Sequence, residues 1–104
     1  MIARKRKKFY YSTYPPEFNE DFKRYVRKRD RFLCSICGER RRLDVHHIDY
    51  TKEHTTVLNC ISLCRDCHYG VHRSGFLMRT EWKYKLWRLA AERERYEKRI
   101  KTVS

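Results

Sequence analysis

Residues 63–72 read LCRDCHYGVH and residues 43–48 read LDVHHI, and these two stretches decide the fold. The LDVHHI stretch is rich in β-branched and apolar residues, which predicts a short strand whose successive side chains point to opposite faces. The LCRDCHYGVH stretch predicts a turn that enters a short helix. Because adjacent helical residues are rotated by about 100°, the cysteines and histidines of this helix can serve different sites.

Four of the five cysteines form two hooks of identical spacing, Cys34-x2-Cys37 and Cys64-x2-Cys67. Each hook can place two thiolates on one tetrahedral ion, so the two hooks predict a four-cysteine zinc site. Four protein ligands leave no open position, and this zinc is therefore expected to be structural. Buried unliganded cysteines would need both spacings to arise by chance, and disulfides would need an oxidising compartment. Cys60 fits neither hook and is expected to be a small core residue.

The histidines form a second group. His46 and His47 are neighbours on the predicted strand, so one of them can bind a metal while the other serves as a base. His68 and His72 are four residues apart on the predicted helix, share a face, and could both point toward His46, although a surface position is the alternative for His72. Two or three imidazoles with open positions would suit a transition ion such as zinc or nickel better than magnesium.

The order His-His, then Asn, then Cys-x2-Cys-His-x3-His resembles the HNH endonuclease family, over the stretch from Cys34 to His72. The resemblance implies an α+β fold with a small ββα-metal core, also called a His-Me finger, that carries the four-cysteine zinc knuckle. It implies that His46 is a metal ligand and that His47 is the general base. It also implies that Asn59 hydrogen-bonds backbone across a loop and so holds His47 in place; a simple turn-forming role is the alternative for Asn59.

Two helices are expected to flank this core. Residues 14–104 are expected to form one HNH nuclease domain, with its core at 32–74 and a long C-terminal helix over about 79–101. Pro15-Pro16 indicates the start of the N-terminal helix, because proline suits a first helical turn. The apolar positions at helical spacing are Phe18, Phe22, Tyr25 and Val26 in the first helix, and Trp82, Leu86, Leu89 and Ala90 in the second.

The chain is strongly basic, with 26 Lys and Arg against 13 Asp and Glu and a formal net charge of +13. An acidic partner is therefore expected, and DNA is the first candidate. A membrane surface is a weaker one, since the aromatics form no stripe and no apolar run is long enough to span a bilayer. Residues 1–13 predict a basic, poorly ordered arm without the apolar stretch of a secretory signal, which favours an intracellular, cytoplasmic protein. The family resemblance implies a prokaryotic or phage origin. The residues expected to hold the DNA backbone are Arg4, Lys5, Arg6, Lys7, Lys8, Lys23 and Arg27, although those on the first helix could instead form a solvated face.

The sequence thus predicts a metal-dependent endonuclease that hydrolyses DNA with low sequence specificity. It would use a histidine base and one catalytic divalent ion, Mn²⁺, Ni²⁺, Zn²⁺ or Mg²⁺. A non-catalytic zinc-ribbon DNA-binding module and an accessory subunit of a phage-type DNA-packaging machinery are the alternatives. The expected state is a monomer or weak dimer, with a larger phage or restriction-type complex as a further partner. Asp44 or Asp49 could orient a histidine ring, and His54 is expected on the surface.

Overall fold

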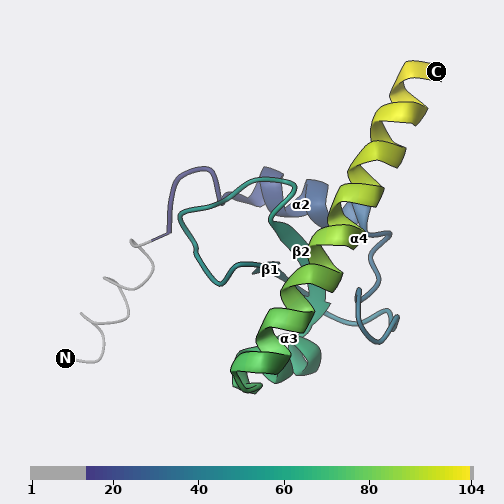
Figure 1. Ribbon diagram of the computed structural model, residues 1–104. Coiled ribbons are helices and arrows are strands. Elements are labelled where there is room, and N and C mark those ends of the chain that lie inside the picture. The colour runs from purple at the N-terminus through teal and green to yellow at the C-terminus, as the bar shows by residue number, and fades with distance from the viewer. Residues whose placement is uncertain (1–13, 104) are drawn as a thin grey trace.

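The computed structural model describes residues 14–103, so the predicted basic arm lies outside the described part of the chain. Its elements are α2 (Glu20–Arg29), β1 (Leu43–His47), β2 (Cys60–Cys64), α3 (Arg65–Arg73) and α4 (Phe76–Val103). Figure 1 shows the short α3 directly after the two strands and the long α4 crossing the sheet. The predicted α+β architecture, with a ββα core and flanking helices, is confirmed.

The two strands pair antiparallel, with Leu43 opposite Cys64 and His47 opposite Cys60. The strand alternation separates the neighbouring histidines, as the sequence predicts. His46 pairs with Ile61, whose side chain packs with α3 and α4, whereas His47 pairs with Cys60, whose side chain packs with α2. Each face of the small sheet is therefore covered by helices, and β2 is buried along its whole length.

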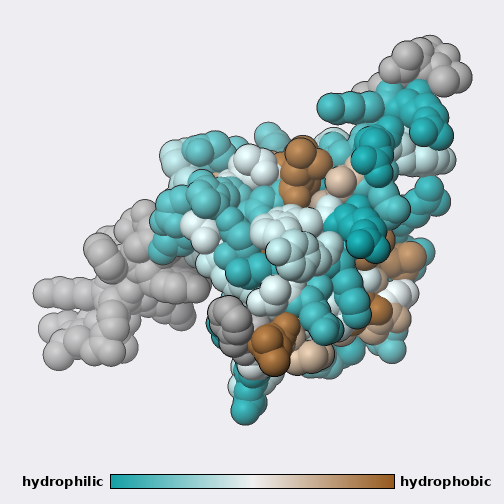
Figure 2. All heavy atoms as spheres, in the orientation of Figure 1, coloured by the Kyte–Doolittle hydropathy of each residue, from teal (hydrophilic) through white to brown (hydrophobic). Residues whose placement is uncertain are grey.

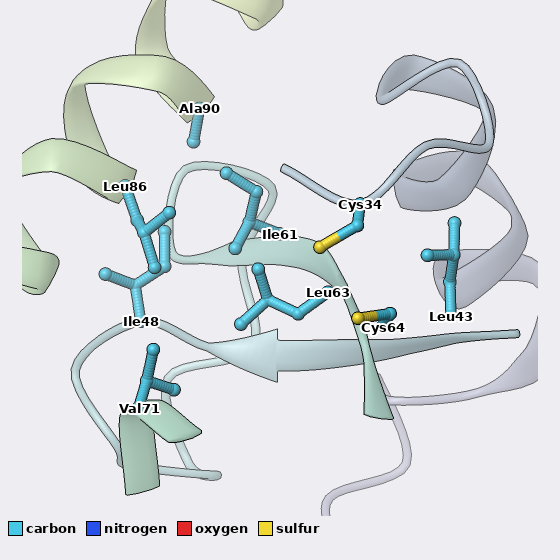
Figure 3. Close-up of a cluster of buried hydrophobic side chains, with 9 residues drawn as sticks. All are labelled: Cys34, Leu43, Ile48, Ile61, Leu63, Cys64, Val71, Leu86 and Ala90. Atoms are coloured by element: carbon cyan, nitrogen blue, oxygen red, sulfur yellow. The ribbon is translucent and has the colours of Figure 1, made fainter. Parts of the chain in front are cut away.

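The larger apolar cluster lies between the sheet, α3 and α4 (Figure 3). Ile61 and Leu63 from β2 contact this cluster together with Val71 from α3 and Leu86 from α4, and none of these side chains is more than 2% exposed. Burial of one such side chain stabilises the fold by about 1.5–3 kcal/mol. Cys34 and Cys64 belong to the same cluster, so the core fixes one cysteine from each hook.

The second, smaller cluster lies on the α2 face of the sheet. Val26, Val45 and Cys60 are buried there, so Cys60 is the core residue that the sequence predicts. The helix begins later than Pro15-Pro16 suggested: it starts at Glu20, because the Asn19 Oδ1 accepts the backbone N–H of Phe22 at 2.9 Å and so caps the first turn. The two prolines lie in the turn before it.

A buried ion network joins α2, β2 and α4. Arg29 donates to the carboxylates of Asp30 and Glu94 and to the carbonyl oxygens of Val57 and Cys60. Charged residues of surface helices are usually exposed, but Arg29 and Glu94 are only 4% and 7% exposed. Four hydrogen-bond acceptors around one guanidinium make its burial possible.

Helix α4 is longer than predicted, and it contains nine Lys and Arg against four Glu. The face of the molecule in Figure 2 is mainly hydrophilic, with small separate apolar patches. Within residues 14–103, no helix has both the length and the apolar character that crossing a bilayer requires.

Candidate active site

The four cysteines of the two hooks come together as predicted. Their sulfur atoms all lie within 4.8 Å of one another. The first hook closes through Gly38, which adopts a positive φ of 76° and whose N–H donates to the Cys34 carbonyl at 2.9 Å. The second hook straddles the start of α3, where the Cys64 Sγ accepts the backbone N–H of Cys67 at 3.4 Å.

The surroundings of this cluster suit thiolates. Burial acts to raise the pKa of Cys34, but backbone N–H groups, including those of Ile36 and Cys37, outweigh it and lower that pKa to about 6. Several thiolates this close repel one another, and burial together with neighbouring thiols raises the pKa of Cys67. A divalent cation removes this repulsion, so the donor set fits a structural zinc-type site.

Three imidazoles form a second cluster on the other side of α3. His46 from β1 and His68 and His72 from α3 each offer a ring nitrogen, and these atoms lie within 4.8 Å of one another. The His68 Nε2 and His72 Nε2 are 3.1 Å apart, and the His46 ring centre lies 5.0 and 5.2 Å from the centres of these two rings. All three predicted catalytic-metal residues are therefore brought together.

The state of these rings fits a metal site. The Nδ1 atom of His46 is buried and has no hydrogen-bond partner among the described residues. Burial, with the neighbouring histidines, lowers the pKa of His46 to about 3, so this ring is neutral and keeps a lone pair for an ion at physiological pH. The Asp44 carboxylate lies 3.2 Å from the His68 Nδ1, which leaves the His68 Nε2 for the cluster. Asp44 is thus the carboxylate that orients a cluster histidine.

His47 lies apart from the three imidazoles, and its hydrogen bond defines its tautomer. Its Nε2 lies 3.0 Å from the Thr55 Oγ1, and the Thr55 hydroxyl itself donates to the Lys52 carbonyl at 2.9 Å. Because the only hydroxyl hydrogen is used on Lys52, the Thr55 oxygen accepts the hydrogen bond that the His47 Nε2–H donates. The lone pair of the neutral ring is therefore on Nδ1. Burial also lowers the pKa of His47, which favours this neutral form.

Asn59 ties together both ends of the loop that follows His47. Its Nδ2 donates to the His54 carbonyl and to the Asp49 carboxylate, both at 2.9 Å, and its Oδ1 accepts from the Asp49 backbone N–H and from the Trp87 indole. These contacts cross the loop as the resemblance implied, and their effect on His47 stays a prediction. His54 is exposed, as predicted, and it contacts Asp49 through its Nδ1 at 2.5 Å.

A cavity of about 480 Å³ connects the imidazoles. Its lining includes His46, His47, His68 and His72, so the candidate base and the candidate metal ligands open into one space. A larger cavity of about 620 Å³ lies beside Cys34 and α4, and no histidine lines it. The smaller cavity is therefore the candidate active site, because the four histidines line it.

Two of the expected DNA-contacting residues are engaged within the protein. Lys23 pairs with Glu20 at 3.0 Å and lies over the Phe18 ring, and the Arg27 Nε donates to the Leu43 carbonyl at 3.2 Å. The other five, Arg4, Lys5, Arg6, Lys7 and Lys8, lie outside the described residues. Sequence reasoning missed Thr55, because a lone threonine in a polar loop carries no spacing signal.

The fold and the two clusters define a small metal-binding domain of the ββα type. Residues 34–74 match the family model of the HNH endonucleases. This segment, which is under half of the chain, contains both cysteine hooks and all three clustered histidines. The resemblance expected from the sequence is thus confirmed over residues 34–74. The chain matches no curated protein and no solved structure.

Proposed function

We propose that this protein is an intracellular, metal-dependent endonuclease that hydrolyses phosphodiester bonds in DNA with low sequence specificity. The observation that carries the proposal is the shared cavity, in which a neutral His47 faces the same space as three convergent imidazoles. The net charge of +13 supports a polyanionic substrate. A zinc module that only binds DNA would have no need of this second cluster.

His47 has the properties of a general base. Its Nδ1 is the ring nitrogen with the lone pair, since the Nε2 proton is held by Thr55. In the proposed reaction Nδ1 takes a proton from water, and the water oxygen forms a bond to phosphorus as the bond from phosphorus to the 3′ oxygen breaks. The leaving 3′ oxygen takes a proton from solvent water and His47 returns its proton to solvent, so the products are a 5′-phosphate and a 3′-hydroxyl end.

His46, His68 and His72 would hold the catalytic divalent ion, with Asp44 fixing the ring of His68. When bound, such an ion supplies Lewis-acid stabilisation of the charge that develops on the phosphate and on the leaving oxygen. His46 is anchored on β1 with a side chain that is 1% exposed, so its ring is held rigidly for this task.

Nicking of supercoiled plasmid tests the proposal. Zinc-loaded protein is incubated with Mn²⁺, Ni²⁺, Zn²⁺ or Mg²⁺ in separate reactions, with the His47→Ala variant as the matched control. Metal-dependent conversion of supercoiled to open-circular DNA by the wild type, reduced by about 10²–10⁴-fold in the variant, is expected. Absence of nicking with every ion, under conditions where the protein binds DNA, would favour the non-catalytic alternative.

A further inference from the structure

Two cations of α4 lie beside the imidazole cluster with no carboxylate partner. The guanidinium carbon of Arg79 lies 5.0 Å from the ring centre of Tyr50, and the Lys83 Nζ lies 5.7 Å from the same centre. Neither residue forms an ion pair with a described residue. Arg29 and Arg93, in contrast, each pair with the Asp30 carboxylate. The charges of Arg79 and Lys83 are therefore not neutralised within residues 14–103.

Tyr50 links these two cations to the candidate metal site. Its ring centre lies 5.2 Å from that of His46 and 5.1 Å from that of His72, in edge-on contacts. Its hydroxyl donates to the Val71 carbonyl at 3.0 Å, which fixes the ring against α3. The Tyr50 backbone has a φ of 63°, a conformation that an aromatic residue adopts only at a cost, and such conformations concentrate at functional sites.

Arg79 is held in place but has donors to spare. One of its terminal nitrogens donates to the His72 carbonyl, while its Nε is buried without a partner in the described part of the chain. A guanidinium has five N–H donors, so three terminal N–H groups remain for an external acceptor besides the buried Nε–H and the one that contacts His72. The planar fork of these donors matches the oxygens of a phosphate.

We propose that Arg79 and Lys83 form a phosphate-binding site for the nucleic-acid strand that enters the cavity, next to the phosphate that is cleaved. The inference rests on the proposed function and deepens it by naming the substrate contacts. The guanidinium is one tyrosine ring away from the His72 imidazole, a separation of at most about 10 Å by the two centre distances. Because each strand of a duplex carries one phosphate per about 3.4 Å of axis, this separation is short enough for a phosphate close to the cleaved one on the same strand.

The helix also provides a matched control pair. Lys85 and Arg88 have the same two charges, lie on the same helix, and are exposed. Since residues are rotated by about 100° along a helix, Arg88 is on the opposite side of α4 from Arg79. The Lys85 Nζ contacts Trp82, not Tyr50. Replacing either pair by alanine removes two positive charges from the same helix, so only position differs.

The test is the salt dependence of binding to a short fluorescein-labelled DNA duplex, measured by fluorescence anisotropy without added divalent ions. For the Arg79→Ala/Lys83→Ala protein, the slope of log Kd against log salt should fall by about 1.8, or about 0.9 for each lost phosphate contact. The Lys85→Ala/Arg88→Ala protein should keep the wild-type slope. The Arg79→Lys protein retains the positive charge and should keep most of the wild-type slope. This variant therefore separates the loss of a charge from a loss of folding.

An unchanged slope in the Arg79→Ala/Lys83→Ala protein would overturn the inference, and so would an equal decrease in the two double variants. Because the assay measures binding and not cleavage, it separates this inference from the proposed function. A wild-type protein that binds DNA through Arg79 and Lys83 but nicks nothing would refute the nuclease and leave the phosphate site standing.

Discussion

The Thr55→Val substitution tests how His47, the proposed general base, is held. Valine has nearly the shape of threonine but has no hydroxyl, so the His47 Nε2 loses its acceptor and the Lys52 carbonyl loses its donor. Thr55 is half-buried in the loop between β1 and β2, and a valine fits there without a change in volume. The substitution should therefore change the orientation and tautomer of one ring while the surrounding fold is retained.

The expected size follows from one hydrogen bond. A hydrogen bond between uncharged groups contributes a net of about 0.5–1.5 kcal/mol, and about 1.4 kcal/mol corresponds to a factor of ten in rate. If this bond holds the reactive tautomer, kcat for nicking should decrease by about 2- to 12-fold. The KM for plasmid should not change, because Thr55 contacts the base and not the substrate.

The assay is initial-rate nicking at saturating metal over a range of plasmid concentrations. The Thr55→Ser protein, which retains the hydroxyl, should recover most of the wild-type kcat. The Thr56→Val protein removes the neighbouring, exposed hydroxyl and serves as the control. A Thr55→Val protein with wild-type kcat would refute the reasoning, as would equal defects in the Ser and Val variants.

Three further predictions concern the two metal sites and the base. The Cys34→Ser protein should lose its structural zinc and much of its cooperative melting transition, because such ions contribute roughly 10–16 kcal/mol to small domains; zinc analysis and circular dichroism check this, and unchanged melting would contradict it. The Asp44→Asn protein should need about 10–100-fold more metal for half-maximal nicking, since the His68 ring loses its carboxylate partner. The kcat should decrease as the pH falls through the pKa of His47, which burial holds below the ordinary value for histidine, because only the neutral base accepts a proton; a decrease centred above that ordinary value would not fit.

The sequence predicted the features that depend on short spacings. These features are local patterns, and each depends only on residues that are close together in the chain. They are the two Cys-x2-Cys hooks, the alternation of His46 and His47, and the i, i+4 pair of His68 and His72. Antiparallel pairing of two short strands then brings the hooks together. The family resemblance rests on the same spacings.

The parts that sequence reasoning missed depend on long-range contacts. Arg29 and Glu94 are 65 residues apart in the chain, and no periodicity indicates that two charged helix faces meet inside the protein. Thr55 gains its role only because the loop folds back on His47. No spacing in the sequence indicates a role for Arg79, since its proximity to Tyr50 arises from the packing of α3 against α4.

The central claim is that His47 acts as the base while His46 and His68 bind the catalytic metal. The most direct test is the nicking rate as a function of Mn²⁺ and Ni²⁺ concentration for the His47→Ala, His46→Ala and His68→Ala proteins. Excess metal should partly restore the His46 and His68 variants, whose defect is weaker metal binding, and should leave His47→Ala about 10²–10⁴-fold impaired. Restoration of His47→Ala alone would reverse the roles of the adjacent histidines, and full activity in all three variants would contradict the assignment of the nuclease site.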